Sequence, residues 1–153
     1  MTILTALASA PSLLRGRGTN HEGEFFAGEL RIEVLEGGRA VLLRYAAVLD
    51  SGVVAHTEST LLGTGPDGRL HLWPVMPELP MVLPHVEIDA HDEAGVSVTA
   101  VFASGAREDA STFREEITIR VHANGSVDYA HAWGLPGGGF ESRSSCSLAP
   151  GDP

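Results

Sequence analysis

The stretch GVVAHTESTLLG, residues 52–63, has the two-residue periodicity of a β-strand. Side chains alternate along a strand, so His56 and Glu58 share one face with Thr60 and Leu62. Glycine stands at each end of the segment, where a strand gives way to a turn. The segment therefore predicts a strand that carries two ionisable side chains on a face with apolar neighbours, and we expect that face to point inward.

The rest of the chain repeats this pattern of short alternating segments between turn residues. Only residues 2–9 suggest a short helix, which Pro11 would stop. The pairs Gly37-Gly38 and Asn124-Gly125 supply the positive φ angles that two-residue hairpin turns require. Strands are predicted at about 12–18, 25–36, 39–49, 53–63, 68–75, 84–90, 95–103, 113–121, 126–134 and 139–148.

About ten strands at near-regular spacing, joined by tight turns, favour an antiparallel meander in one domain over residues 1–153. Closing the meander removes its exposed edges, so we predict an all-β, up-and-down antiparallel barrel of about ten strands. The alternative is a Greek-key sandwich, which needs one longer connection. WPVMPELPMVLP, residues 73–84, is the candidate, because four prolines prevent a central strand there.

Composition excludes several functions. The formal net charge of −10 opposes binding to nucleic acid or to anionic membranes. All ten basic residues are Arg, so the chain has no Lys for a Schiff base or for a phosphate-binding loop. No apolar stretch approaches the roughly 20 residues that span a bilayer.

The only cysteine, Cys146, permits no intrachain disulfide and is expected to be a buried, inert thiol. The opening MTILTALASA lacks the basic region and the long apolar run of a signal peptide. We therefore expect an acidic cytoplasmic protein.

An ordered set of motifs runs over about residues 14–84. It consists of Gly16-Arg17-Gly18, Gly38-Arg39-Ala40-Val41-Leu42-Leu43-Arg44-Tyr45, Gly52-x-x-x-His56-x-Glu58-x-x-x-Leu62, Gly68-x-Leu70-x-Leu72 and Pro74–Pro84. In this order the motifs resemble those of the nitrobindin-like proteins of the calycin superfamily, relatives of the fatty-acid-binding proteins; the match beyond is looser. The resemblance implies a ten-stranded barrel with an internal cavity open at one end and, in haem-binding members, an iron ligated by a histidine near the last strand.

The chain departs from that pattern at two places. The last predicted strand, GFESRSSCSLA, has no histidine, so His131, one strand earlier, is the nearest candidate for an axial ligand. The tryptophan that often precedes the first Gly-x-Gly is replaced here by Leu13-Leu14. Haem ligation is therefore carried over only as an alternative.

The leading hypothesis is a calycin-type protein that binds a small, apolar or amphipathic molecule inside the barrel. His56 and Glu58 would be polar anchors, with Arg44 on the neighbouring strand as their partner. The alternative is that the same groups form a structural network that fixes strand register. The expected ligand-binding set is His56, Glu58, Arg44, Tyr45, Trp73, Tyr129, His131 and Trp133.

Three further hypotheses stay open: a haem protein that uses His131, an enzyme that uses His56 and Glu58 as acid and base, and a homodimer that meets through residues 73–84. We expect no metal site and assign no catalytic residue. His85, Glu87, Asp89 and His91 alternate with apolar residues as on a half-solvated strand. His21 is expected in a loop, either solvated or gating the barrel mouth.

Overall fold

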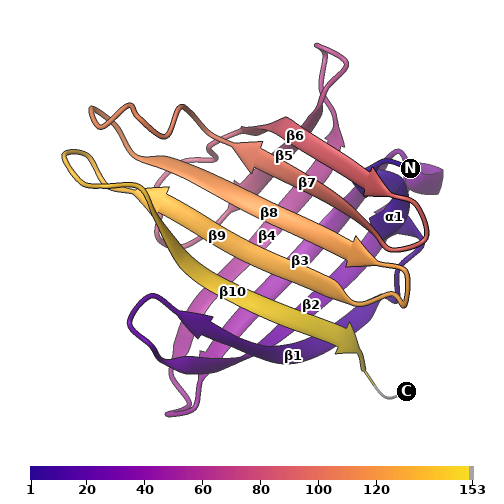
Figure 1. The fold of residues 1–153 in the computed structure, drawn as a ribbon, viewed down its shortest axis with the longest axis horizontal. Helices are drawn as coiled ribbons and strands as arrows, with labels where there is room; N and C mark the ends of the chain where they lie inside the picture. Colours follow the sequence, from indigo (N-terminus) through magenta and orange to yellow (C-terminus); the bar gives the residue numbers. More distant parts are fainter. Residues whose placement is uncertain (152–153) are drawn as a thin grey trace.

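The protein is a closed barrel of ten antiparallel strands with one short helix at its N-terminus (Figure 1). The structure, a computed structural model, describes residues 1–151. Each strand pairs with its sequence neighbours, and β1 also pairs with β10. The strands are β1 (Leu13–Asn20), β2 (Phe25–Leu35), β3 (Ala40–Leu49), β4 (Val54–Thr64), β5 (Leu70–Val75), β6 (His85–Glu93), β7 (Ser97–Ala103), β8 (Arg114–His122), β9 (Val127–Gly134) and β10 (Glu141–Pro150).

The predicted fold class is confirmed, and the sandwich alternative is wrong because the β1–β10 pair closes the sheet. The pairing runs without a break from Leu14 opposite Pro150 to Asn20 opposite Ser144. Closure pairs the two terminal strands with each other, so neither β1 nor β10 is an exposed edge, which is the advantage of this topology over an open meander.

The proline-rich segment begins inside the barrel wall. Pro74 lies in β5 opposite Thr60 of β4, although proline cannot donate a backbone hydrogen bond. β5 pairs with β6 only through His71 and Leu72, so Pro74 has a strand partner on one side alone. The chain then leaves the sheet and reaches β6 through an irregular loop, 76–84.

The helix α1 (Ile3–Ala8) covers one end of the barrel, against β2, β3, β7 and β8. The Thr2 hydroxyl caps the helix by accepting a hydrogen bond from the backbone N–H of Thr5. Ile3 and Leu7 are buried and complete the apolar core at this end. No helix among residues 1–151 is long and apolar enough to cross a membrane.

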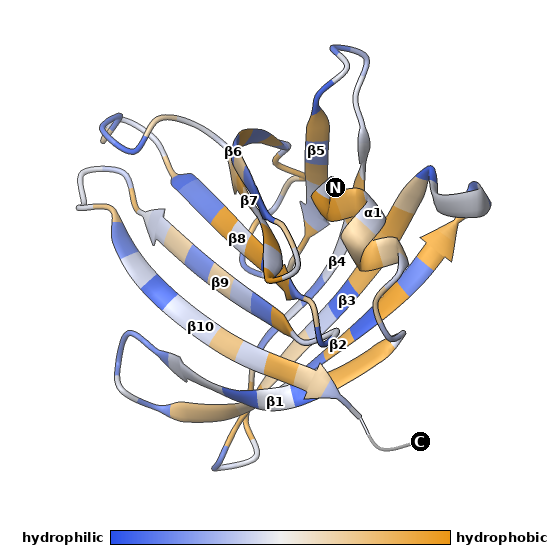
Figure 2. Ribbon diagram, turned by 45° about the vertical axis from the view of Figure 1, so that its right-hand side comes forward, coloured by the Kyte–Doolittle hydropathy of each residue, from blue (hydrophilic) through white to orange (hydrophobic). Residues whose placement is uncertain are grey.

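Along several strands, hydrophilic and hydrophobic residues alternate (Figure 2), and on β2 buried and exposed residues alternate in the same way. The inside of the barrel changes character along its axis. On the inner face of β4, Leu62 and Thr60 are fully buried, Glu58 is 4% exposed, and the side chain of His56, nearest the far end, is 20% exposed. The barrel is therefore packed solid near α1, while polar side chains line its interior toward the opposite end.

Candidate functional site

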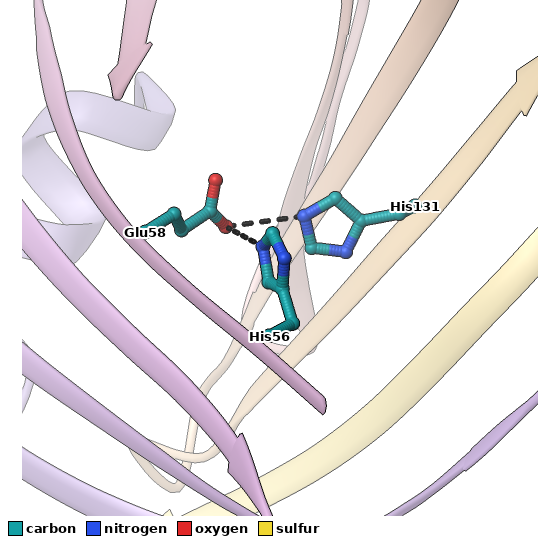
Figure 3. Close-up of side chains that lie close together, drawn as sticks. All are labelled: His56, Glu58 and His131. Carbon is teal, nitrogen blue, oxygen red and sulfur yellow. Dashed lines mark hydrogen bonds and ion pairs between the residues drawn. The ribbon is translucent and has the colours of Figure 1, made fainter. Parts of the chain in front are cut away.

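The polar interior joins two strands that are not neighbours in the sheet. β4 directs His56 and Glu58 inward, as the two-residue period predicts. β9 directs Tyr129, His131 and Trp133 inward from across the barrel. His131 and Glu58 are 73 positions apart in the chain, and barrel closure brings them into contact (Figure 3).

A single carboxylate oxygen stands between two imidazoles. Glu58 Oε1 lies 3.1 Å from His131 Nε2 and 3.9 Å from His56 Nε2. The other oxygen, Oε2, accepts a hydrogen bond of 3.2 Å from the Thr60 hydroxyl. The two imidazole rings meet edge to face, with 5.3 Å between their centroids.

The outer ring nitrogens of both histidines face polar partners. His56 Nδ1 is 2.9 Å from a carboxylate oxygen of Glu78, and His131 Nδ1 is 3.4 Å from the Ser144 hydroxyl. Two buried side-chain atoms in residues 1–151 have no hydrogen-bond partner: His56 Nε2 and the Tyr129 hydroxyl. Both belong to this cluster, and buried polar groups without partners often mark a functional position.

The cluster is strongly polarised. Burial alone would raise the pKa of Glu58, but His131 and His56 outweigh it and hold that pKa well below its usual range. Burial alone would lower the pKa of His56, but Glu58 and Glu78 outweigh it and raise the pKa to about 9. Burial raises the pKa of Tyr129, and the negative charge of Glu58 raises it further. The interior therefore holds an ionised carboxylate beside an imidazolium.

A cavity of about 380 Å³ opens at the end of the barrel opposite α1. His56 and His131 form part of its polar floor, and most of the exposed lining is apolar. Its volume falls within the roughly 300–1,000 Å³ typical of small-molecule sites. The apolar lining includes Phe26, Ala47, Met76, Leu79, Phe113 and Leu135.

Trp133 stands at the mouth of this cavity. The Arg143 guanidinium lies over its indole ring at 3.9 Å, and His21 meets the ring edge-on at 6.0 Å. His21 is exposed and also lines the cavity, so its position fits both expectations for this residue. The mouth therefore carries a cation held in place by an aromatic ring.

The structure brings most of the expected site residues together. Tyr45, His56, His131 and Trp133 line the cavity. Tyr129 is fully buried beneath it, stacked on Tyr45 with 4.8 Å between ring centroids.

Two expected site residues lie outside the barrel. Arg44 was predicted to partner Glu58, but Tyr45 is the residue opposite Glu58, so Arg44 projects outward and is exposed. Trp73 stacks on His71 on the outer face, because the adjacent Leu72 fills the interior. Both corrections follow from the rule that neighbouring residues on a strand point to opposite faces.

Sequence reasoning missed residues that reach the site from loops and from neighbouring strands. Glu78 comes from the loop after β5 and Arg143 from β10, and neither carries a sequence signal for such a role. Glu115 lines the cavity and lies 2.9 Å from His85 Nε2. His85 is fully buried, so the expectation of a half-solvated face is wrong at this position.

His56, Glu58 and His131 could together hold a metal ion, since one ligand atom from each lies within 4.8 Å of the other two. They fit haem iron poorly. Axial ligation needs an imidazole nitrogen that faces open space, whereas His131 Nε2 already faces the Glu58 carboxylate at 3.1 Å. β10 has no histidine to replace it.

Comparisons with known proteins establish the fold alone. The chain matches no protein-family profile, and it matches no curated protein sequence. Among solved structures it is similar to Rv2717c from M. tuberculosis, with a TM-score of 0.75 over 97% of each chain. The two sequences are 14% identical, so the similarity concerns the barrel and not its ligand.

Proposed function

We propose that this protein binds a small, mainly apolar or amphipathic molecule in the cavity at the open end of the barrel. The supporting observation is the cavity itself: about 380 Å³, mostly apolar, with His56 and His131 at its floor. An apolar wall with a few fixed polar groups is the common design of small-molecule sites. A purely structural polar network would need no open volume next to it.

The charges at the site suggest how an amphipathic ligand would be oriented. His56, with a pKa of about 9, is a cation at neutral pH, and Arg143 provides a second positive group at the mouth. Glu78 and Glu115 place carboxylates on the same wall. We expect the apolar part of the ligand to lie against Phe26, and its polar group to contact the histidine floor or Arg143.

The ordered motifs at the start of the chain and the fold similarity to Rv2717c support placement in the nitrobindin-like calycin group. A cytoplasmic location stays a prediction, and the single free, buried cysteine is in keeping with it. Homodimerisation through residues 73–84 remains a prediction. In that segment Met76 turns into the cavity, while Met81 and Val82 are exposed.

The test is a binding screen with a built-in geometric control. Saturated fatty acids of graded length, hemin and the fluorophore 1-anilinonaphthalene-8-sulfonate are added to the purified chain, and thermal shift and fluorescence are followed. Ala47→Leu fills the cavity, whereas Ala46→Leu adds the same volume on the outer face of the same strand. We expect Ala47→Leu to weaken binding at least about 10-fold, the effect of losing roughly 1.4 kcal/mol, and Ala46→Leu to leave it unchanged.

If no probe binds, or if both variants bind as the wild type does, the proposal fails. The absorption spectrum recorded with hemin tests the haem alternative separately. A Soret band that disappears in His131→Ala would support that alternative.

A further inference from the structure

We propose that His56, Glu58 and His131 form a binding site for one divalent transition-metal ion, of the class of Zn²⁺, Fe²⁺ or Co²⁺. The donor set is two imidazole nitrogens and one carboxylate oxygen, which these ions accept readily. The inference does not depend on the binding of an organic molecule. It rests on the geometry of three side chains and on the groups that surround them.

The ligand atoms already converge. Metal–nitrogen and metal–oxygen bonds of about 2.0–2.2 Å place ligand atoms about 3–3.5 Å apart around one ion. Glu58 Oε1 lies 3.1 Å from His131 Nε2 and 3.9 Å from His56 Nε2. The ligand atoms of the two histidines are within 4.8 Å of each other, so an ion between the three requires each atom to move by less than about 1 Å. Figure 3 shows both Nε2 atoms directed at the same carboxylate oxygen.

A further polar group also orients each of the three side chains. Histidines that bind metals usually direct the second ring nitrogen to a carboxylate or another hydrogen-bonding group, which fixes the tautomer. Here Glu78 lies 2.9 Å from His56 Nδ1, and Ser144 lies 3.4 Å from His131 Nδ1. Thr60 holds the second oxygen of Glu58 at 3.2 Å. This arrangement leaves both Nε2 atoms as the ring nitrogens directed into the cluster.

An ion would also explain why His56 Nε2 is buried without a hydrogen-bond partner. A plain ion-pair network satisfies His131 and Glu58 but leaves this nitrogen 3.9 Å from the carboxylate, beyond hydrogen-bond range. A metal would bond to it directly and displace the proton that the His56 imidazolium carries in the metal-free protein, so binding would release a proton. His56 and His131 both line the cavity, so an ion with three protein ligands could take a fourth ligand from that side.

The experiment is a titration of the untagged full-length chain after treatment with a chelator and desalting. Co²⁺ is added while its visible d–d absorption is recorded, and Zn²⁺ is added in a calorimeter. We expect one ion per chain, and a Co²⁺ spectrum of low coordination number that Zn²⁺ abolishes. Absence of stoichiometric binding by the wild type would overturn the proposal. Neither titration contains an organic ligand, so this result is independent of the cavity-binding screen.

Variants locate the ion. His56→Gln, His131→Gln and Glu58→Gln should each weaken Zn²⁺ binding by at least about 100-fold, and Glu78→Gln, which acts only through His56, by about 10-fold. The matched control is His91→Gln, because His91 has its own carboxylate neighbour, Asp89, at 3.0 Å but is exposed on the outer face. We expect it to bind Zn²⁺ as the wild type does.

A measurement on the wild type protects the test against variants that fail to fold. X-ray absorption of the Zn²⁺-loaded chain should show two imidazoles and at least one oxygen ligand. A spectrum with fewer than two imidazoles would overturn the proposal, as would unchanged affinity in folded His56→Gln and His131→Gln proteins.

Discussion

The closing seam between β1 and β10 depends on glycine. Gly16 lies opposite Leu148 of β10 and Gly28 of β2. A Cβ atom added to Gly16 would stand 1.8 Å from the carbonyl oxygen of Ser147 and 2.8 Å from its carbonyl carbon. These are backbone atoms, so no side-chain rotation can make room. We predict that Gly16→Ala destabilises the barrel by forcing the two strands apart.

Two effects set the size of this loss. Without a clash, alanine in place of a strand glycine would raise the free energy of unfolding by about 0.5–1 kcal/mol, because alanine leaves the unfolded chain fewer backbone conformations. Overpacking costs about 1–3 kcal/mol and occasionally more, and a clash with fixed backbone belongs at the upper end. We therefore expect the free energy of unfolding to fall by about 2 kcal/mol. In a chain of this size that lowers Tm by about 4–8 °C.

Gly63 provides the matched control. It is also a strand glycine, in β4, but an added Cβ would meet its nearest neighbour, the Cβ of Ala40, at 3.5 Å, which is an ordinary contact. Gly63→Ala should equal the wild type or exceed it by up to about 1 kcal/mol. Urea unfolding followed by circular dichroism measures both variants, and amide exchange should rise in β1 and β10 of Gly16→Ala alone. Equal stability of the two variants would refute the reasoning.

Three further predictions concern other parts of the barrel. Burial raises the pKa of the Cys146 thiol, so we expect slow reaction with Ellman's reagent at pH 8 in the folded protein and one equivalent in denaturant; rapid labelling of the folded protein would contradict this. Burial alone would raise the pKa of Asp128, but hydrogen bonds from His122 and Ser147 outweigh it and lower that pKa. The ionised form of Asp128 therefore stabilises the fold above the unfolded pKa of about 4, and this stabilisation is lost as pH falls through the folded-state pKa. Urea unfolding over a pH series should show that the free energy of unfolding falls less at acid pH in Asp128→Asn than in the wild type. Arg114 is buried and donates to three loop carbonyls, so Arg114→Ala should cost about 3 kcal/mol and speed proteolysis of loops 104–113 and 135–140; unchanged cleavage would count against that role.

Turn chemistry and alternation predicted the ten strands correctly. The expected segment 53–63 became β4, Val54–Thr64, and the other nine strands also lie within a few residues of their predicted bounds. Gly37, Gly38 and Gly125 have positive φ, as expected. The two-residue turns predicted there are wrong, because four residues separate the strands at both places, 36–39 and 123–126, and Asn124 does not have positive φ. The strands and the places of the turns depend on a few adjacent residues, which is why they can be read without knowing the fold.

The candidate site was only half predictable. Alternation placed His56 and Glu58 on one face, and Tyr129, His131 and Trp133 on another. It could not decide between Arg44 and Tyr45 as the residue opposite Glu58, since that choice depends on the register between β3 and β4. The bulge opposite His56, between Ala47 and Val48, shifts that register and has no clear mark in the sequence.

The sequence by itself determined the strands, the turns and which side chains share a face, because each of these is a local property of a chain with a two-residue period. Only the tertiary structure decided that Glu58 meets His131, that Glu78 supports His56, and that a cavity lies beside them. The reason is physical: a contact across 73 residues depends on strand number, register and closure acting together, and each of these is fixed by the packing of the whole barrel.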